Sequence, residues 1–188
     1  MKLQKVTEVI QKFARQVVTE AKANASKDKV TGTLVNSIRS KEKITLGESL
    51  ITFFMEGYGK FVDAGVEGVK GGRSEGKELY GRKFRYTSKG GKRGLKGMPP
   101  TGPLDKWVVR KKGLSKLVRD NRGRFIPRKT LVFLIAKSIF IKGLQPSLFF
   151  TLPFKKYFKQ LPDQLAKAYG EDFITEIKII TAKNNGNI

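Results

Sequence analysis

The side chains that most often perform catalysis are missing from this chain of 188 residues. It contains no cysteine and no histidine, which excludes a thiolate nucleophile, an imidazole base, a disulfide and the commonest metal ligands. Its 16 acidic residues are few and scattered, so they do not indicate a carboxylate metal site. Asp63 and Glu67 lie in a predicted loop with nothing beside them to complete an acid–base pair, so we expect them to be solvent-exposed or to form salt bridges. The sequence therefore predicts a protein that is not an enzyme and holds no metal or cofactor.

A basic, glycine-rich stretch at 67–97 invites comparison with phosphate-binding loops. The run SKGGKRG from Ser88 lacks the Ser or Thr that must follow the lysine of such a loop, so nucleotide binding is disfavoured. Arginine alternates with aromatic residues at 82–86, a pattern that could contact nucleic acid through phosphate neutralisation and base stacking. The interpretation that we favour for this stretch is a solvated loop, or one that docks on a protein.

The net charge of +23 is concentrated in one part of the chain. Residues 67–131 hold 20 Lys or Arg and 5 acids, a surplus of 20 − 5 = 15. Such a field attracts polyanions or an acidic protein face. The candidate polyanion contacts are Arg73, Arg82, Lys83, Arg85, Lys92, Arg93, Arg110, Lys111 and Lys112.

The elements of the N-terminal half follow from hydrophobic spacing. Apolar residues recur every three or four positions and predict an amphipathic helix over 2–26, which packs on its own sheet or on a neighbouring subunit. The β-branched residues of 42–56, with Gly47 as a turn, predict a β-hairpin or two strands. Residues 57–65 should form a tight turn whose aromatic side chains are buried. The stretch at 67–97 should be a mobile loop, with 83–87 as half of a small hairpin.

Two helices are predicted between Met98 and Lys142. The first runs from about Leu104 to its cap at Gly113, with its single tryptophan, Trp107, packed inward. The second spans 129–142 and ends at Gly143 in a left-handed conformation. This second helix is apolar around most of its circumference, so its own domain or neighbouring subunits must bury it.

The C-terminal part should begin a new helix after Phe149 and Phe150 and continue to about residue 170, with a kink or restart at Pro162. Residues 173–181 could extend that helix or form a strand. We expect one α+β domain over 1–182, with an N-terminal amphipathic helix, a small antiparallel sheet, the basic loop insertion and C-terminal helices, followed by a frayed tail at 183–188. No apolar window suits a membrane span and no signal segment is evident, so we expect no membrane association.

Several stretches, in this order, resemble the tail-completion proteins of tailed bacteriophages, which are neck or head-to-tail connector proteins. They are GTLVNSI from Gly32, YGKFVDAG from Tyr58, the Pro-rich entry to the Trp107 helix, and GLQPSLFF from Gly143. The resemblance implies α+β subunits that form a homo-oligomeric ring between portal and tail, around the genome channel. It also implies a virion location after assembly in the host cytoplasm, with the portal and tail proteins of the same phage as partners.

The resemblance suggests a set of contacts with subunits or partners, namely Tyr58, Phe61, Val62, Asp63, Trp107, Phe149 and Phe150. The long basic loop at 67–97 departs from the family's pattern. This leaves open which ring forms and whether the loop touches genomic DNA or an acidic protein collar. The rival hypothesis is a basic nucleic-acid-binding protein of the ribosomal or packaging type, supported by the pI of about 10.3.

Overall fold

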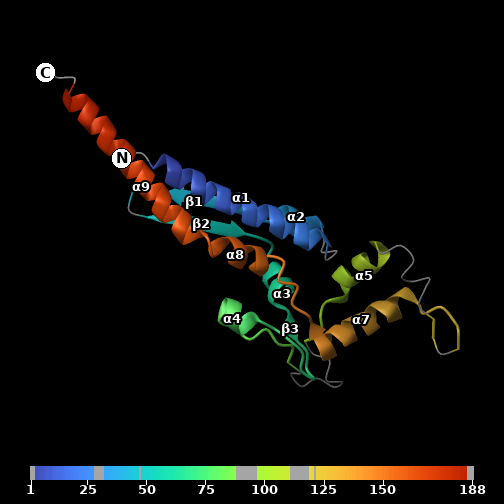
Figure 1. Ribbon diagram of the computed structural model, residues 1–188. Coiled ribbons are helices and arrows are strands. Elements are labelled where there is room, and N and C mark those ends of the chain that lie inside the picture. The colour runs from blue at the N-terminus through green and yellow to red at the C-terminus, as the bar shows by residue number, and fades with distance from the viewer. Residues whose placement is uncertain are drawn as a thin grey trace. The chain divides into compact units, whose positions relative to one another are not determined.

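The computed structural model describes residues 3–27, 32–46, 48–87, 97–110, 119–120 and 122–185; for Pro103, Trp107, Arg110 and 182–185 it describes the backbone alone. The chain consists of two compact units (Figure 1). Unit 1 comprises 1–59 and 148–188, and unit 2 comprises 60–147. Each unit contains helices and one small antiparallel pair of strands, which confirms the predicted α+β class. The expectation of one domain over 1–182 stays a prediction.

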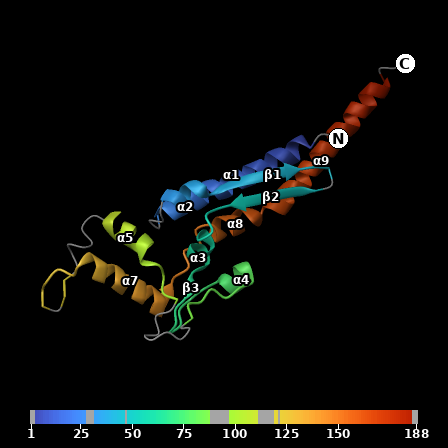
Figure 2. The same cartoon turned by 180° about the vertical axis from the view of Figure 1, so that it is seen from behind.

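Unit 1 is a β-hairpin covered by helices. Its elements are α1 (Gln4–Lys27), α2 (Gly32–Ser37), β1 (Arg39–Ile44), β2 (Ser49–Phe54), α8 (Thr151–Phe158) and α9 (Leu161–Asn185). The strands pair antiparallel from Arg39↔Phe54 to Ile44↔Ser49, and Figure 2 shows them lying along α1. The predicted N-terminal helix and hairpin are therefore confirmed, with the first strand beginning three residues earlier than expected.

Helix α1 runs antiparallel to α8 and α9. Near its C-terminal end, Glu20 accepts hydrogen bonds from Lys156 Nζ at 2.8 Å and Tyr157 Oη at 2.6 Å. Nearer the middle of α1, Phe13 packs edge-on against Phe53 and Phe154, with ring centroids 6.3 and 5.9 Å apart. The buried apolar stripe of α1 thus meets the hairpin on one side and the C-terminal helices on the other.

The start of α1 is fixed by a carboxylate from the far end of the chain. Asp172 of α9 is only 5% exposed, and its two oxygens accept the backbone N–H groups of Lys5 and Val6, each at 3.0 Å. The first N–H groups of a helix have no partner within the helix, so this side chain satisfies two of them. The pairing also sets the register of α9 along α1.

Unit 2 contains α3 (Gly59–Ala64), β3 (Val66–Glu67), α4 (Gly76–Tyr80), α5 (Thr101–Arg110), α7 (Arg128–Lys142) and β4 (Gly143–Leu144). Strands β3 and β4 pair antiparallel at Val66↔Leu144 and Glu67↔Gly143. One apolar cluster joins Ala64, Val66 and Phe84. A second cluster joins α5 to α7 through Val108, Leu131 and Val132.

Two predicted loops of unit 2 contain regular structure. Helix α3 replaces the turn expected at 57–65, and α4 lies inside the expected loop at 67–97. Residues 83–86 form no hairpin of their own; they pair with β3 through the N–H of Glu67 to Phe84 O and of Tyr86 to Glu67 O, each 2.8 Å. Residues 88–96 of the loop lie outside the described part of the chain.

The glycines at 68–72 let the chain close the C-terminal end of α7. The N–H groups of Val69 and Lys70 donate to the carbonyls of Phe140 and Ile141 at 2.9 and 3.1 Å. A Cβ at Gly68 would collide with the carbonyl oxygen of Ile141. These contacts use carbonyls that a helix end leaves without a partner, so the glycines serve close packing rather than mobility.

The remaining helix predictions are mostly confirmed. Helix α7 begins one residue before the expected start. Gly143, which belongs to β4, has φ 85° and ψ −173°: its φ is positive, but its conformation is not left-handed helical. Helix α5 begins at Thr101, and its expected cap at Gly113 is outside the described residues. The strand alternative for 173–181 is wrong, because α9 continues to Asn185.

We predict that Asp172→Ala destabilises the protein by about 2 kcal/mol, because two helix N–H groups lose a charged acceptor in a buried position. Urea denaturation of the variant and the wild type measures this free energy of unfolding. The control is Glu171→Ala, which removes the same charge from the neighbouring exposed position of α9. Equal stability losses in the two variants would contradict the capping role.

Candidate interaction surfaces

The contact residues expected from the resemblance are divided between exposed and buried positions. Tyr58 and Phe61 are both more than a third exposed, and the Phe61 ring lies 4.7 Å from that of Phe84. Val62 is half-buried, and its carbonyl accepts the N–H and hydroxyl of Ser147 at 3.1 and 3.0 Å. The first two side chains are therefore partly exposed, whereas Val62 is held within unit 2.

The aromatic pair at 149–150 lies in the core of unit 1. Phe149 is 1% exposed. The Phe150 ring packs on Phe53 at 5.3 Å and on Phe154 at 6.0 Å. Both precede α8, where the sequence placed them, and they anchor this helix. The side chain of Trp107 lies outside the described atoms, so its inward packing and its partner contact stay predictions.

Asp63 is fully buried, although the sequence suggested a solvent-exposed or ion-paired loop carboxylate. Its carboxylate accepts the hydroxyl of Tyr80 at 3.4 Å, which links α3 to α4. Burial, reinforced by the carboxylate of Asp63, raises the pKa of Tyr80 to about 12. Asp63 therefore belongs to the interior of unit 2 rather than to its surface.

The candidate polyanion contacts that the structure describes lie at the surface of unit 2. Arg73 pairs with Glu75 at 2.7 Å, and Arg85 approaches Glu67 at 3.9 Å. Arg82 and Lys83 are exposed on the same segment as Arg85, next to β3. Lys92, Arg93, Lys111 and Lys112, and the side chain of Arg110, lie outside the described atoms. Part of the expected basic charge is thus already paired with acids.

The C-terminal half of α9 is an exposed apolar surface that the sequence did not single out. Because Asp172 meets the beginning of α1, residues 173–185 continue past that helix for roughly 20 Å (Figure 1). Five large side chains there are 45–58% exposed: Phe173, Ile174, Ile177, Ile179 and Ile180. We call residues 173–185 the free arm. The sequence left open whether 173–181 form a helix or a strand, and only the register of α1 against α9 shows where the cover of α9 ends.

Among the described residues, no group of three His, Cys, Asp or Glu side chains could hold a metal ion. None of their helices is both long and apolar enough to cross a membrane. The surfaces described above are suited to contacts with other macromolecules.

Comparison of the chain with models of protein families, with curated proteins and with solved structures found no match. The function must therefore be argued from the residues and their geometry.

We predict that Tyr80 titrates near pH 12 in the folded protein, because its half-buried phenol, next to the carboxylate of Asp63, resists ionisation. Tyrosinate absorbance during an alkaline titration, with Tyr80→Phe to assign the step, measures this. Since unfolded tyrosine ionises near pH 10, the unfolded chain loses a proton that the folded chain keeps, and Tyr80's contribution to stability should fall as the pH rises from about 10 to about 12. A Tyr80 step near pH 10 would contradict the burial.

Proposed function

We propose that the chain is a structural virion protein of a phage neck, which forms part of a ring between the portal vertex and the tail, around the genome channel. Its location is the virion, after assembly in the host cytoplasm. Its partners are other copies of itself and the portal and tail proteins of the same phage. It performs no catalysis. The ordered motifs that resemble tail-completion proteins suggest this role, and the free arm supplies the physical argument for self-association.

The free arm carries the proposal because it needs a partner to bury its side chains. Five large apolar residues within eight positions form a surface that monomeric proteins seldom leave in water. Burying such a side chain contributes about 1.5–3 kcal/mol, so a few of them suffice for a specific contact. The arm is therefore suited to a stable protein–protein interface.

The occupant we propose for this surface is a second copy of the chain. The free arm holds Glu176, Lys178 and Lys183, a net charge of only +1 in a chain of net charge +23. A nearly neutral arm meets the basic surface of another copy with less repulsion than two strongly basic surfaces would experience. Contact between the arm of one copy and a different face of the next is head-to-tail, the arrangement that closes into rings.

The second candidate is a basic nucleic-acid-binding protein of the ribosomal or packaging type. The net charge of +23 favours it. The extended apolar surface of α9 argues for the connector, since contacts with phosphates do not require it. The two candidates predict different behaviour of the purified protein after nuclease treatment.

We predict that the purified protein forms a discrete oligomer that persists at high salt, because apolar contacts are not screened by ions. Ile177→Asp with Ile180→Asp should weaken self-association at least tenfold, since each charge would be buried without a partner. Light scattering over a range of protein concentrations measures the mass.

The matched control for this pair is Thr175→Asp with Thr181→Asp, which adds two carboxylates at exposed positions of the same helix. The control should retain the oligomer. A wild-type protein that stays monomeric at every concentration, or a control that dissociates equally, would contradict self-association through the arm.

We also predict that deleting 88–96 separates docking from self-association. The deletion removes Lys89, Lys92, Arg93 and Lys96 but no acid. Thr87 and Gly97, which flank the deleted residues, lie close together, because a Cβ on Gly97 would be 3.0 Å from Thr87 O. The two ends can therefore be rejoined without disturbing Phe84 in the core. The connector hypothesis expects an unchanged oligomer that docks poorly on its portal or tail ring, measured by co-sedimentation. Loss of DNA binding with docking unchanged would favour the nucleic-acid hypothesis.

A further inference from the structure

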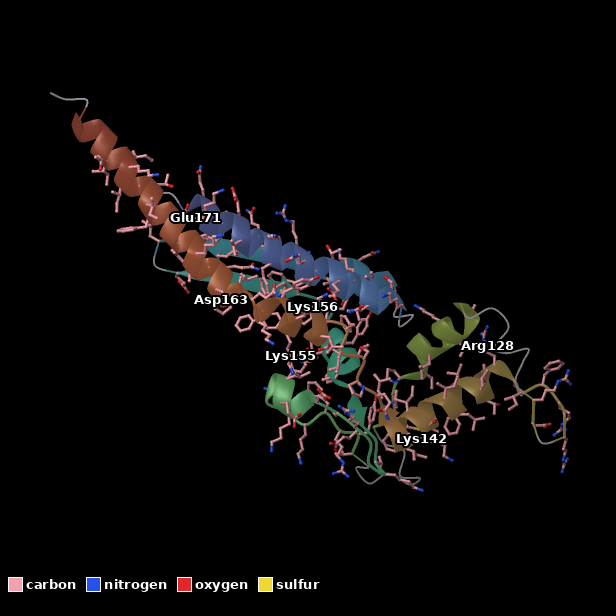
Figure 3. The ribbon with its side chains drawn as sticks, viewed as in Figure 1. Arg128, Lys142, Lys155, Lys156, Asp163 and Glu171 are labelled. Carbon is pink, nitrogen blue, oxygen red and sulfur yellow. The ribbon has the colours of Figure 1, made fainter. Side chains whose placement is uncertain are left out.

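A basic turn lies just before α7. It is separate from the stretch at 67–97, which holds Arg73, Arg82, Lys83 and Arg85. Arg119 and Phe125 pair as an isolated antiparallel bridge, and the N–H of Asp120 donates to Arg124 O at 2.8 Å. The N–H of Gly123 donates a hydrogen bond to Asp120 O at 2.9 Å. We name Arg119, Asp120 and residues 122–125 the arginine turn. Figure 3 shows its nitrogen-tipped side chains beyond the labelled Arg128.

The only acid of the arginine turn is used to hold its backbone. One oxygen of Asp120 accepts the N–H groups of Arg122 and Arg124, each at 2.9 Å. The other accepts Arg124 Nε at 3.0 Å. The backbone N–H of Arg124 is the main cause that lowers the pKa of Asp120, so this carboxylate is ionised at neutral pH. The turn is therefore shaped before any ligand arrives.

The arginine side chains are presented at the surface. The guanidinium carbon of Arg119 lies 4.1 Å from the centre of the Phe125 ring, and its Nη1 donates to Gly123 O at 2.7 Å. Phe125 is 56% exposed, and the Arg124 side chain is 71% exposed. Arg122 is exposed and pairs with no acid among the described residues. Three guanidinium groups thus come from one short turn. Those of Arg119 and Arg124 are already oriented, the second by its ion pair with Asp120, and that of Arg122 is left for a ligand.

We propose that the arginine turn binds the phosphodiester backbone of duplex DNA. The planar guanidinium fork fits phosphate oxygens, and a preformed turn loses little conformational freedom when it binds. Lys129 extends the positive surface onto the first turn of α7, whereas Arg128 is already paired with Asp105 at 3.0 Å. The contact we propose is made with phosphates, which are the same in every sequence, so it is independent of sequence.

The choice of duplex DNA as the source of the phosphates rests on the proposed function, in which the ring surrounds the genome. The turn itself is a physical site that can be tested on the full-length protein alone. The oligomer mass, measured on the same samples, reports on ring formation separately. Failure of one hypothesis therefore does not imply failure of the other.

The test measures the affinity of full-length variants for a fluorescent DNA duplex of about 20 base pairs. Fluorescence anisotropy reports the binding, and the titration is repeated at several salt concentrations. Arg122→Ala should lower the slope of log affinity against log salt by about 1 and weaken two unrelated duplex sequences equally. The matched control Arg15→Ala, which removes an exposed arginine from α1, should leave the slope unchanged.

A second variant separates the shape of the turn from its charge. Asp120→Ala raises the net charge by one but removes the carboxylate that holds the turn. The proposal expects weaker binding to DNA despite the added positive charge. Tighter binding would overturn it, because charge alone would then account for the affinity.

Equal changes of the salt slope in the Arg122 and Arg15 variants would overturn the proposal, as would a wild type that does not bind the duplex. So would polyglutamate that displaces the labelled duplex as well as unlabelled DNA of the same charge does, because the ligand would then be an acidic protein surface. An unchanged oligomer mass in Arg122→Ala would show that the loss of DNA affinity does not come from a failed assembly.

Discussion

The two hydrogen bonds from the carboxylate of Asp172 to the start of α1 fix how unit 1 is put together. They join residues 166 and 167 positions apart and set which turn of α9 faces which turn of α1. From that register follow the pairing of Leu161 with Phe13 and Val17 in the core and the hydrogen bonds between Glu20 and α8. The same register leaves the second half of α9 without cover. A buried carboxylate thus determines where an apolar interface remains open.

The sequence predicted what depends on local periodicity. The stripe of α1, the hairpin, the apolar α7 and the helix after Phe150 all arise from spacings within a few turns, and the structure confirms them. The resemblance to a phage connector family, and the partners it implies, remain hypotheses that the fold does not test. Residues 88–96 and 111–118, with several of the expected basic contacts, lie outside the described part of the chain.

What the sequence could not predict depends on contacts between distant segments. The glycines at 68–72 suggested a mobile loop, but Gly68 lies against the carbonyls at the end of α7, far along the chain. Asp63 looked like a surface acid, yet Tyr80 and the packing of α3 bury it. Single-sequence patterns carry no information about such long-range contacts, so composition alone suggested flexibility and exposure.

The discontinuous make-up of unit 1 has a consequence for synthesis. Unit 2 is one uninterrupted segment, so its contacts can form as soon as Ser147 has left the ribosome. Helix α1 can pack on the hairpin early, but the side of its apolar stripe that faces α8 and α9 stays exposed until these last parts are made. A truncated product that stops before α8 would therefore carry the whole sequence of unit 2 and an N-terminal helix whose uncovered side is open to chaperones and proteases.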